Sequence, residues 1–179
     1  MPEKLFSGLS DVKSAQGVLG FFSKPEWRWS DLTSYILYLD RVQDPGNLGA
    51  LLRTAAATGI FSVVTSPGTV SCFNSKVVRA STGYLFSVPC IQGLPIHALV
   101  ERDYQLLVAH PRDGKSVYDV QVDPPVALVV GSEGSGVDDS SFGESVQRIH
   151  LPMDLETDSL NAAVSGSILM YEVLRRTIS

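Results

Sequence analysis

Apolar and polar positions along the chain predict strands that alternate with helices from residue 35 onward. Strands are expected where short apolar runs stand between turn residues, at residues 35–39, 60–64, 105–109, 126–130 and 147–151. Helices are expected where the spacing of apolar residues is helical, at residues 47–58, 75–82, 94–102 and 159–176. This alternation is typical of an α/β fold built on a parallel sheet.

Residues at the element ends suggest where the helices begin and end. Asn47 can cap the first helix and Gly59 can end it, and Asp158 or Ser159 can cap the last one. The run over residues 126–130 is wholly apolar, as expected for a central strand that is covered on both faces.

The chain is predicted to form one main domain. Residues 1–30 are mixed and irregular, so we expect an N-terminal segment that leads into a domain over residues 31–179. Ligands of parallel α/β sheets bind at the carboxyl ends of the strands, so the loops that follow the strands are where chemistry is expected.

Composition and charge narrow the class of protein. The 179 residues are 44% hydrophobic and 18% charged, which fits a globular domain and excludes a disordered chain. The net charge of −5 argues against binding nucleic acid over the whole surface, but it allows a local basic site. There is no apolar run of about 20 residues and no signal-like leader, so we expect a cytoplasmic protein without a membrane span.

The two cysteines do not suggest a metal site. Cys72 and Cys90 form no CxxC pair and have no neighbouring histidine, so we expect packed thiols in a reducing compartment and no bound metal.

A first candidate site lies where the first strand passes into the first helix. A turn rich in Asp, Pro and Gly precedes Asn47, and the N-terminus of a helix attracts anions. Arg53 follows nearly two helical turns later, on roughly the same side. By themselves, these two residues could equally be a simple cap and a surface charge.

A second candidate site is the Gly-Ser-Glu-Gly-Ser-Gly run over residues 131–136, directly after an apolar strand. Glycines there allow the backbone to approach a ligand closely. The run lacks the Lys-Ser/Thr pair of a Walker A loop. Glu133 would repel a polyphosphate, whereas it suits a cationic ligand or a helix N-terminus.

A third candidate site joins the last strand to the last helix. The strand ends at Pro152, and the helix opens with Ser159-Leu160-Asn161 and continues through several small residues. Small residues predict a close contact with another backbone, although a well-packed terminal helix would show the same pattern.

Together, the three segments resemble the SpoU-like (TrmH-like) branch of the SPOUT RNA ribose 2′-O-methyltransferases. The resemblance extends over residues 14–176 and rests on the order and spacing of residues 44–49 with Arg53, 131–136, 151–153 and 159–161, with 74–83 also similar.

The resemblance implies a parallel-sheet α/β fold with a C-terminal trefoil knot, S-adenosylmethionine as cofactor, and a ribose 2′-hydroxyl of rRNA or tRNA as acceptor. It also implies a homodimer that forms through the small residues of the C-terminal helix. The catalytic residues that it implies are Asn47, Arg53, Glu133, Ser159 and Asn161. The implied cofactor-binding residues are Ala109, His110, Gly131, Glu133, Gly136, Leu151, Met153 and Leu160. The residues nominated for RNA contact are Arg41, Arg53, Lys76 and Arg79, although the last two could equally form a solvated helix face.

Two features depart from the family pattern. Many members carry a small RNA-binding domain before the catalytic one, so either such a domain is missing here or RNA is recognised in another way. Asp154, Glu156 and Asp158 make the loop before the last helix unusually acidic. Trp27 and Trp29 could stack on a base, but a packed pair is favoured.

Two other functions remain open at this point. One is a catalytically silent knotted module for RNA binding or assembly, although the presence of Asn47, Arg53, Glu133 and Asn161 favours an enzyme. The other is a nucleotide-binding α/β protein that uses residues 131–136 as a phosphate loop, which the missing lysine disfavours.

Overall fold

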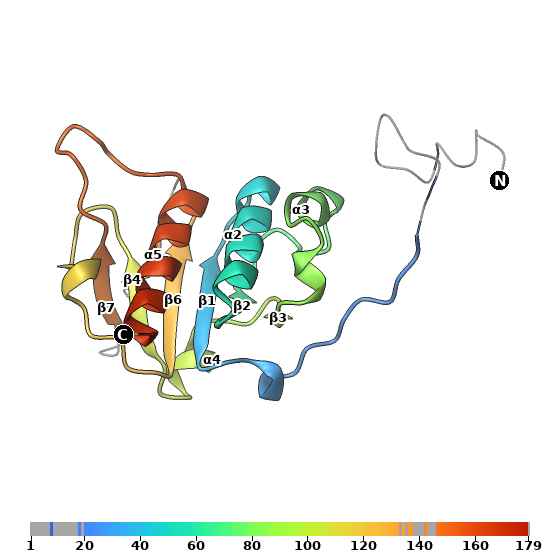
Figure 1. Cartoon of the computed structure of the whole chain (residues 1–179), viewed down its shortest axis with the longest axis horizontal. Coiled ribbons are helices and arrows are strands. Elements are labelled where there is room, and N and C mark those ends of the chain that lie inside the picture. The colour runs from blue at the N-terminus through green and yellow to red at the C-terminus, as the bar shows by residue number, and fades with distance from the viewer. Residues whose placement is uncertain are drawn as a thin grey trace.

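A parallel sheet organises the computed structural model, which describes residues 8, 18, 20–132, 134, 136, 137, 142 and 146–178. Within those residues the sheet has seven strands in the order β3-β2-β1-β6-β4-β7-β5, and all the paired neighbours are parallel (Figure 1). The strands are β1 Tyr35–Asp40, β2 Phe61–Thr65, β3 Cys90–Ile91, β4 Gln105–Ala109, β5 Lys115–Ser116, β6 Val126–Gly131 and β7 Val146–His150. The helices are α2 Pro45–Thr58, α3 Ser75–Ala80, α4 His97–Val100 and α5 Ala162–Thr177, with 3₁₀ turns η1 Trp29–Asp31, η2 Tyr84–Phe86 and η3 Val117–Asp119. The predicted α/β fold with a parallel sheet is confirmed.

Side chains alternate across the central strand and build a core on each face of the sheet. Leu128 and Val130 of β6 point into the core shared with α2, α3 and α5, while Ala127 and Val129 point into the core shared with α4 and the segment around Trp29. All four are almost fully buried, as the apolar run predicted. Helices α2 and α5 lie side by side across one face (Figure 1).

The first helix begins earlier than predicted. Asp44 caps α2, because its Oδ1 accepts a hydrogen bond from the Asn47 backbone N–H at 2.8 Å, and Pro45 takes the first helical position. The prediction that Asn47 is the cap is therefore wrong. Gly59 ends the helix with a φ of 72°, as predicted.

The last helix begins later than predicted. Asn161 caps α5, and its Oδ1 accepts hydrogen bonds from the backbone N–H groups of Ala163 at 2.9 Å and Val164 at 3.2 Å. Neither Asp158 nor Ser159 is the cap. The helix expected over residues 94–102 is reduced to α4, because Pro95 disfavours helical backbone at the residue before it.

The small residues of α5 face the core. Ala162 and Ala163 are buried, and a Cβ on Gly166 would lie 2.6 Å from the Leu51 side chain of α2. Thr54 and Ser167 share a hydrogen bond of 2.9 Å between the same two helices. The close contact predicted for these small residues is made with α2, and a dimer contact through them stays a prediction.

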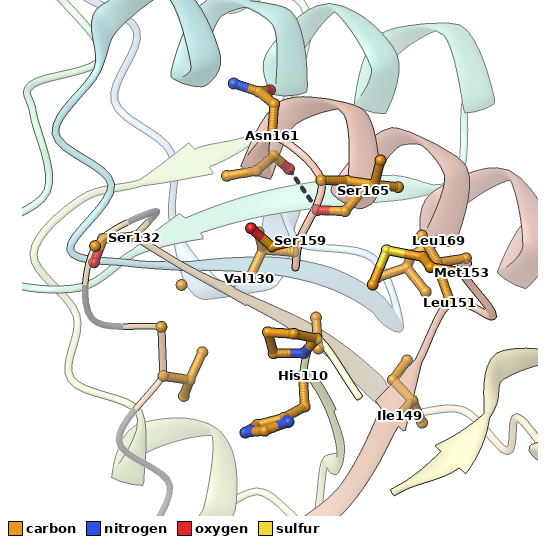
Figure 2. Close-up of a pocket in the computed structure, with 18 residues that line it drawn as sticks. His110, Val130, Ser132, Ile149, Leu151, Met153, Ser159, Asn161, Ser165 and Leu169 are labelled. Atoms are coloured by element: carbon orange, nitrogen blue, oxygen red, sulfur yellow. Dashed lines mark hydrogen bonds between the residues drawn. The ribbon is translucent and has the colours of Figure 1, made fainter. Parts of the chain in front are cut away.

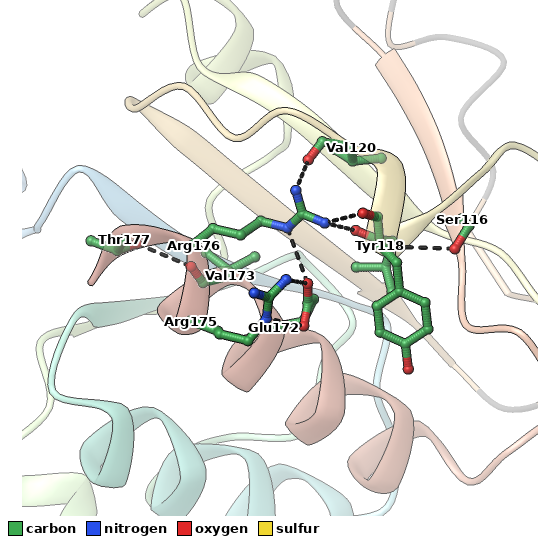
Figure 3. Close-up of polar contacts among 9 residues, drawn as sticks. Ser116, Tyr118, Val120, Glu172, Val173, Arg175, Arg176 and Thr177 are labelled. Carbon is green, nitrogen blue, oxygen red and sulfur yellow. Dashed lines mark hydrogen bonds and ion pairs between the residues drawn. The ribbon is translucent and has the colours of Figure 1, made fainter. Parts of the chain in front are cut away.

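A charged cluster fixes the end of α5 to the connection between β5 and β6 (Figure 3). The Arg176 guanidinium donates to the backbone carbonyls of Val117 at 3.0 Å and Val120 at 2.6 Å, and also to that of Tyr118. The buried Glu172 carboxylate accepts from Arg175 at 2.7 Å and from Arg176 at 3.1 Å. The hydrogen bonds from Arg175 are the main cause of a lowered pKa at Glu172.

The structure also shows how Trp29 and the two cysteines pack. Trp29 packs edge-on against Tyr104, with ring centroids 6.1 Å apart. The Arg102 Cζ lies over the Trp29 ring, 4.2 Å from its centroid. These contacts favour the packed interpretation of Trp29. The Cys72 and Cys90 sulfurs lie 3.2 Å apart as free thiols, and Cys72 is fully buried. Within the described residues no helix is long and apolar enough to cross a bilayer, and no group of three potential metal ligands occurs.

Candidate functional site

A cavity of about 450 Å³ opens at the carboxyl ends of β4, β6 and β7. Among the described residues, the lining comes from 109–111 after β4, from 130–132, 134, 136 and 137 after β6, and from parts of 149–153 and 159–169 around and after β7. The second and third candidate segments of the sequence therefore meet here, because β4, β6 and β7 are neighbours in the sheet and end at the same edge. The first candidate segment, with Asn47 and Arg53, lies outside the lining. Figure 2 shows the side chains of His110, Met153, Ser159 and Asn161 around the cavity.

The wall after β4 is held in a defined orientation. The backbone N–H of His110 donates to the Ile149 carbonyl of β7 at 2.8 Å, and its imidazole Nδ1 accepts from the Asp113 backbone N–H at 3.0 Å. With Nδ1 engaged as an acceptor, the neutral ring carries its proton on Nε2. Ala109, His110 and Pro111 all line the cavity.

The wall after β6 is a tight backbone loop that contains Gly131, Gly134 and Gly136, and we call it the glycine loop. The Gly136 N–H donates to the Ser132 carbonyl at 2.9 Å, and Gly136 adopts a φ of 61°. A Cβ on Gly131 would lie 2.4 Å from the Gly136 carbonyl carbon and 2.7 Å from the Val137 nitrogen. Only glycine fits at position 131, so the backbone itself forms this side of the cavity. Glu133, which was predicted for both catalysis and cofactor binding, lies outside the described residues.

The third wall is formed by the segment after β7 and by the start of α5. Leu151, Met153, Ser159 and Leu160 line the cavity, and Asn161 follows as the helix cap. The first backbone N–H groups of α5 are satisfied by Asn161, so its side chain fixes the local geometry of the helix entrance.

A contact between two asparagines joins the first and third candidate segments. The Asn161 Nδ2 donates to the Asn47 Oδ1 at 3.1 Å, although the two residues are 114 positions apart. Asn161 therefore orients Asn47 while its own Oδ1 caps α5. Asn47 lies beside the cavity without lining it.

The basic residues predicted for RNA contact lie outside the cavity lining. Arg53 is exposed on α2, and Lys76 and Arg79 are exposed on α3. Arg41 pairs with Asp40 at 2.6 Å, and its guanidinium is 3.5 Å from the Gly136 carbonyl of the glycine loop. Of these four cations, Arg41 makes a contact with a cavity-lining segment.

The described part of the lining is uncharged apart from the titratable His110. It consists of aliphatic side chains, three serines, an asparagine, and backbone groups of the glycine loop. Apolar surfaces with a few fixed polar groups suit a flat heterocycle whose edge needs hydrogen bonds. Gly131 packs against the backbone of Gly136 and Val137, so a side chain there would displace the loop that forms this wall. The described residues therefore fit a nucleoside-type cofactor.

Several lining residues were not predicted. Ser165 and Leu169 lie one and two helical turns beyond Asn161, so helical periodicity could have identified them. The others are chain neighbours of predicted positions. The unpredicted lining residues are Pro111, Val130, Ser132, Gly134, Val137, Ile149, Ala162, Ser165 and Leu169.

Comparison with known proteins gives one consistent family. The model of the SpoU rRNA Methylase family matches residues 34–171. The chain is 31% identical over 176 residues to the 23S rRNA (guanosine(2553)-2′-O)-methyltransferase RlmP of Bacillus subtilis (strain 168). That match covers 97% of this chain and 71% of RlmP.

Two solved structures that resemble the chain contain the same cofactor. An AdoMet-bound rRNA methyltransferase from Sinorhizobium meliloti matches with a TM-score of 0.73 and 29% identity, over 81% of this chain and 57% of that chain. The SpoU methyltransferase AviRb from Streptomyces viridochromogenes, in complex with AdoMet, matches with a TM-score of 0.73 and 25% identity, over 86% of this chain and 66% of that chain. This chain thus spans less than two thirds of each solved chain.

Proposed function

The chain belongs to the SpoU rRNA methylase family, and from that premise we propose that it binds S-adenosylmethionine in the cavity and methylates a ribose 2′-hydroxyl of RNA. The observation that carries the proposal is the cavity itself. A glycine-framed pocket, whose described lining contains no Lys, Arg, Asp or Glu, lies at the carboxyl ends of β4, β6 and β7 and is joined to Asn47 through Asn161.

The residues that hold the cofactor would be those of the three walls. The glycine loop supplies backbone groups at Gly131 and Gly136, Leu151 and Leu160 supply apolar surface, and His110 closes the side next to β4. Bound S-adenosylmethionine supplies a methyl group on a sulfonium, which is already a strong electrophile. The protein therefore has to align the 2′-oxygen with that methyl carbon and assist loss of the hydroxyl proton, and S-adenosylhomocysteine would be released as the other product.

The acceptor side would be formed by polar groups beside the cavity. Asn47, oriented by Asn161, would contact the ribose, and Ser159 at the cavity wall would contribute a hydroxyl. A guanidinium is a very weak proton acceptor, so Arg53 is assigned no role as the base. Its role would be to bind the adjacent phosphate and to stabilise developing charge on the 2′-oxygen.

The path of the chain supports the proposal of a trefoil knot. Strand β7 lies beyond β4, whereas α5 packs on β6 and α2. The segment from β7 to α5 must therefore run back along the sheet edge that carries the loops after β4 and β6 (Figure 1). Such a return beside two other loops is what threading requires.

A homodimer is also proposed, now through apolar rather than small residues of α5. Val164, Ile168 and Tyr171 of α5 are 49%, 41% and 51% exposed and follow one another at three- or four-residue spacing. Leu160, which precedes the helix cap, is 37% exposed and extends this stripe. Leu160 also lines the cavity, so a partner on this stripe would border the cofactor. Ile168→Glu should convert the dimer to a monomer in light scattering.

RNA contact is proposed for Arg41, Arg53, Lys76 and Arg79. Helix α3 packs tightly on α2 at Gly49, where a Cβ would lie 2.3 Å from the Ala80 Cβ, so the cations of the two helices belong to one rigid surface.

The decisive experiment compares ligands and then activity. S-adenosylhomocysteine should raise the melting temperature of the protein and ATP should not, because the pocket lacks a phosphate-binding lysine. Labelled methyl groups should then be transferred to ribosomal or transfer RNA from cells, and nuclease digestion should yield 2′-O-methylnucleosides. RNA binding without transfer, despite S-adenosylhomocysteine binding, would favour the silent module. Stabilisation by ATP alone would favour the nucleotide-binding protein.

A further inference from the structure

The connection between β7 and α5, residues 151–161, forms one wall of the cavity without regular secondary structure. We call it the β7–α5 loop. Its middle, from Asp154 to Asp158, is largely exposed, and its two ends line the cavity. Its conformation therefore determines whether Met153 and Ser159 reach the cavity, yet Leu151 is the only one of its residues that is buried in the core.

Arg112 is bound to the middle of this loop. One terminal nitrogen of its guanidinium donates to the Leu155 carbonyl at 2.7 Å and to the Thr157 carbonyl at 2.8 Å. The loop presents these carbonyls on a turn, in which Asp154 accepts from the backbone N–H groups of Glu156 at 3.0 Å and Thr157 at 3.1 Å. Arg112 thus binds backbone carbonyls of the turn and not one of its side chains.

The base from which Arg112 extends is rigid. The next residue, Asp113, donates its N–H to His110 Nδ1 at 3.0 Å and pairs with Arg148 of β7 at 2.7 Å. Gly114 follows with a φ of 92°, and a Cβ there would lie 2.1 Å from the Arg148 carbonyl. Arg112 therefore connects two walls of the cavity, the His110 wall and the β7–α5 loop.

The charge of Arg112 also suits the composition of the loop. The two carbonyls that it binds alternate along the chain with the acidic residues Asp154, Glu156 and Asp158. Three carboxylates in five residues repel one another, and the guanidinium on the intervening carbonyls adds a positive charge to the same segment.

We propose that Arg112 is a positioning residue for the cofactor pocket, which keeps the β7–α5 loop in the conformation that lines the cavity. The proposal rests on the proposed function, since it takes S-adenosylmethionine as the ligand. Arg112 itself lies outside the cavity lining, so its effect on the cofactor would pass through the loop.

The test measures binding of S-adenosylhomocysteine by calorimetry to the full chain carrying Arg112→Ala, Arg112→Lys or Lys115→Ala. Without the Arg112 contacts, the β7–α5 loop adopts its binding conformation for only part of the time, and the apparent Kd rises in proportion. We expect Arg112→Ala to raise Kd roughly fivefold, or about 1 kcal/mol. Arg112→Lys should recover part of that loss, because an ammonium can still donate to the carbonyls. Lys115→Ala removes an exposed cation three residues away and should leave Kd unchanged.

Hydrogen exchange of peptides from the β7–α5 loop supplies an independent readout. Without ligand, Arg112→Ala should speed exchange in this loop while the melting temperature stays within about 2 °C of wild type, since the residue is exposed. An unchanged Kd, a Kd equally raised by Lys115→Ala, or a melting temperature lowered by several degrees would each overturn the proposal. Failure of the wild type to bind S-adenosylhomocysteine would instead refute the proposed function. Hydrogen exchange in the β7–α5 loop would still test whether Arg112 holds that loop.

Discussion

The substitution Gly131→Ala tests whether backbone approach forms the cofactor pocket. The new Cβ would lie 2.4 Å from the Gly136 carbonyl carbon, 2.5 Å from the Gly136 oxygen and 2.7 Å from the Val137 nitrogen. Ordinary carbon contacts begin at about 3.5 Å, so the loop must move by about 1 Å. All three neighbours are backbone atoms, so no side-chain rotation can relieve the clash.

The expected cost can be worked from these contacts. Overpacking of this kind costs about 1–3 kcal/mol, and movement of the loop sacrifices the hydrogen bond between Gly136 and Ser132, which contributes about 1 kcal/mol. The total is roughly 2–4 kcal/mol. In the free protein the exposed loop can relax, so most of the cost should fall on ligand binding. We therefore expect the Kd for S-adenosylhomocysteine to rise roughly thirty- to a thousandfold.

Calorimetric titration at 25 °C measures this effect, and Gly134→Ala is the matched control. It adds the same methyl group to the same loop, where a Cβ would meet no atom within 4 Å. Gly134 also lines the cavity, so the Kd of Gly134→Ala should rise by no more than about threefold, far less than for Gly131→Ala. Wild-type affinity in Gly131→Ala, or an equal loss in both variants, would refute the reasoning that links close backbone approach to cofactor binding.

Three further predictions concern the frame around the site. Gly49→Ala should destabilise the protein by about 1–3 kcal/mol in urea denaturation, because the added methyl would lie 2.3 Å from the Ala80 Cβ. Ala80→Gly should partly restore the stability of that variant. Full additivity of the two changes would argue against the contact. Glu172→Gln should cost about 1–3 kcal/mol at pH 7. The lowered pKa of Glu172 gives stability that is present above the unfolded value of about 4.3 and is lost as pH falls through the folded value, so variant and wild type should converge once the pH lies below the folded value. Finally, Cys72 and Cys90 should resist a thiol reagent at pH 8 until the protein unfolds, because Cys72 is buried and the hydrogen bond with Cys72 raises the pKa of Cys90; rapid native labelling would contradict the packing.

Most of the sheet was predictable because its information is local. The strands β1, β4 and β6 stand out as apolar runs, since a strand covered on both faces needs apolar residues at nearly every position. The two-residue strands β3 and β5 were not predicted, because a pattern cannot be read from two residues. Sheet order was also beyond the sequence, since it depends on how distant segments pair.

The helix ends show how local signals compete. Asp44 and Asn47 are both good capping residues, as are Asp158, Ser159 and Asn161. The side chain that finds a free backbone N–H becomes the cap, and in each case it was a neighbour of the predicted residue. Sequence alone offered no means to choose, because the choice depends on where the preceding loop delivers the chain.

The fold class, the glycine loop and the segment that opens the last helix could be predicted from the sequence, because strand ends, glycine loops and helix starts are written in consecutive residues. The contacts that join distant segments depend on the tertiary structure. Asn161 meets Asn47 from 114 positions away, and Arg112 reaches carbonyls 43 and 45 positions away. Such contacts join groups that any local pattern treats as unrelated, and they form only when the sheet brings its strand ends to a common edge.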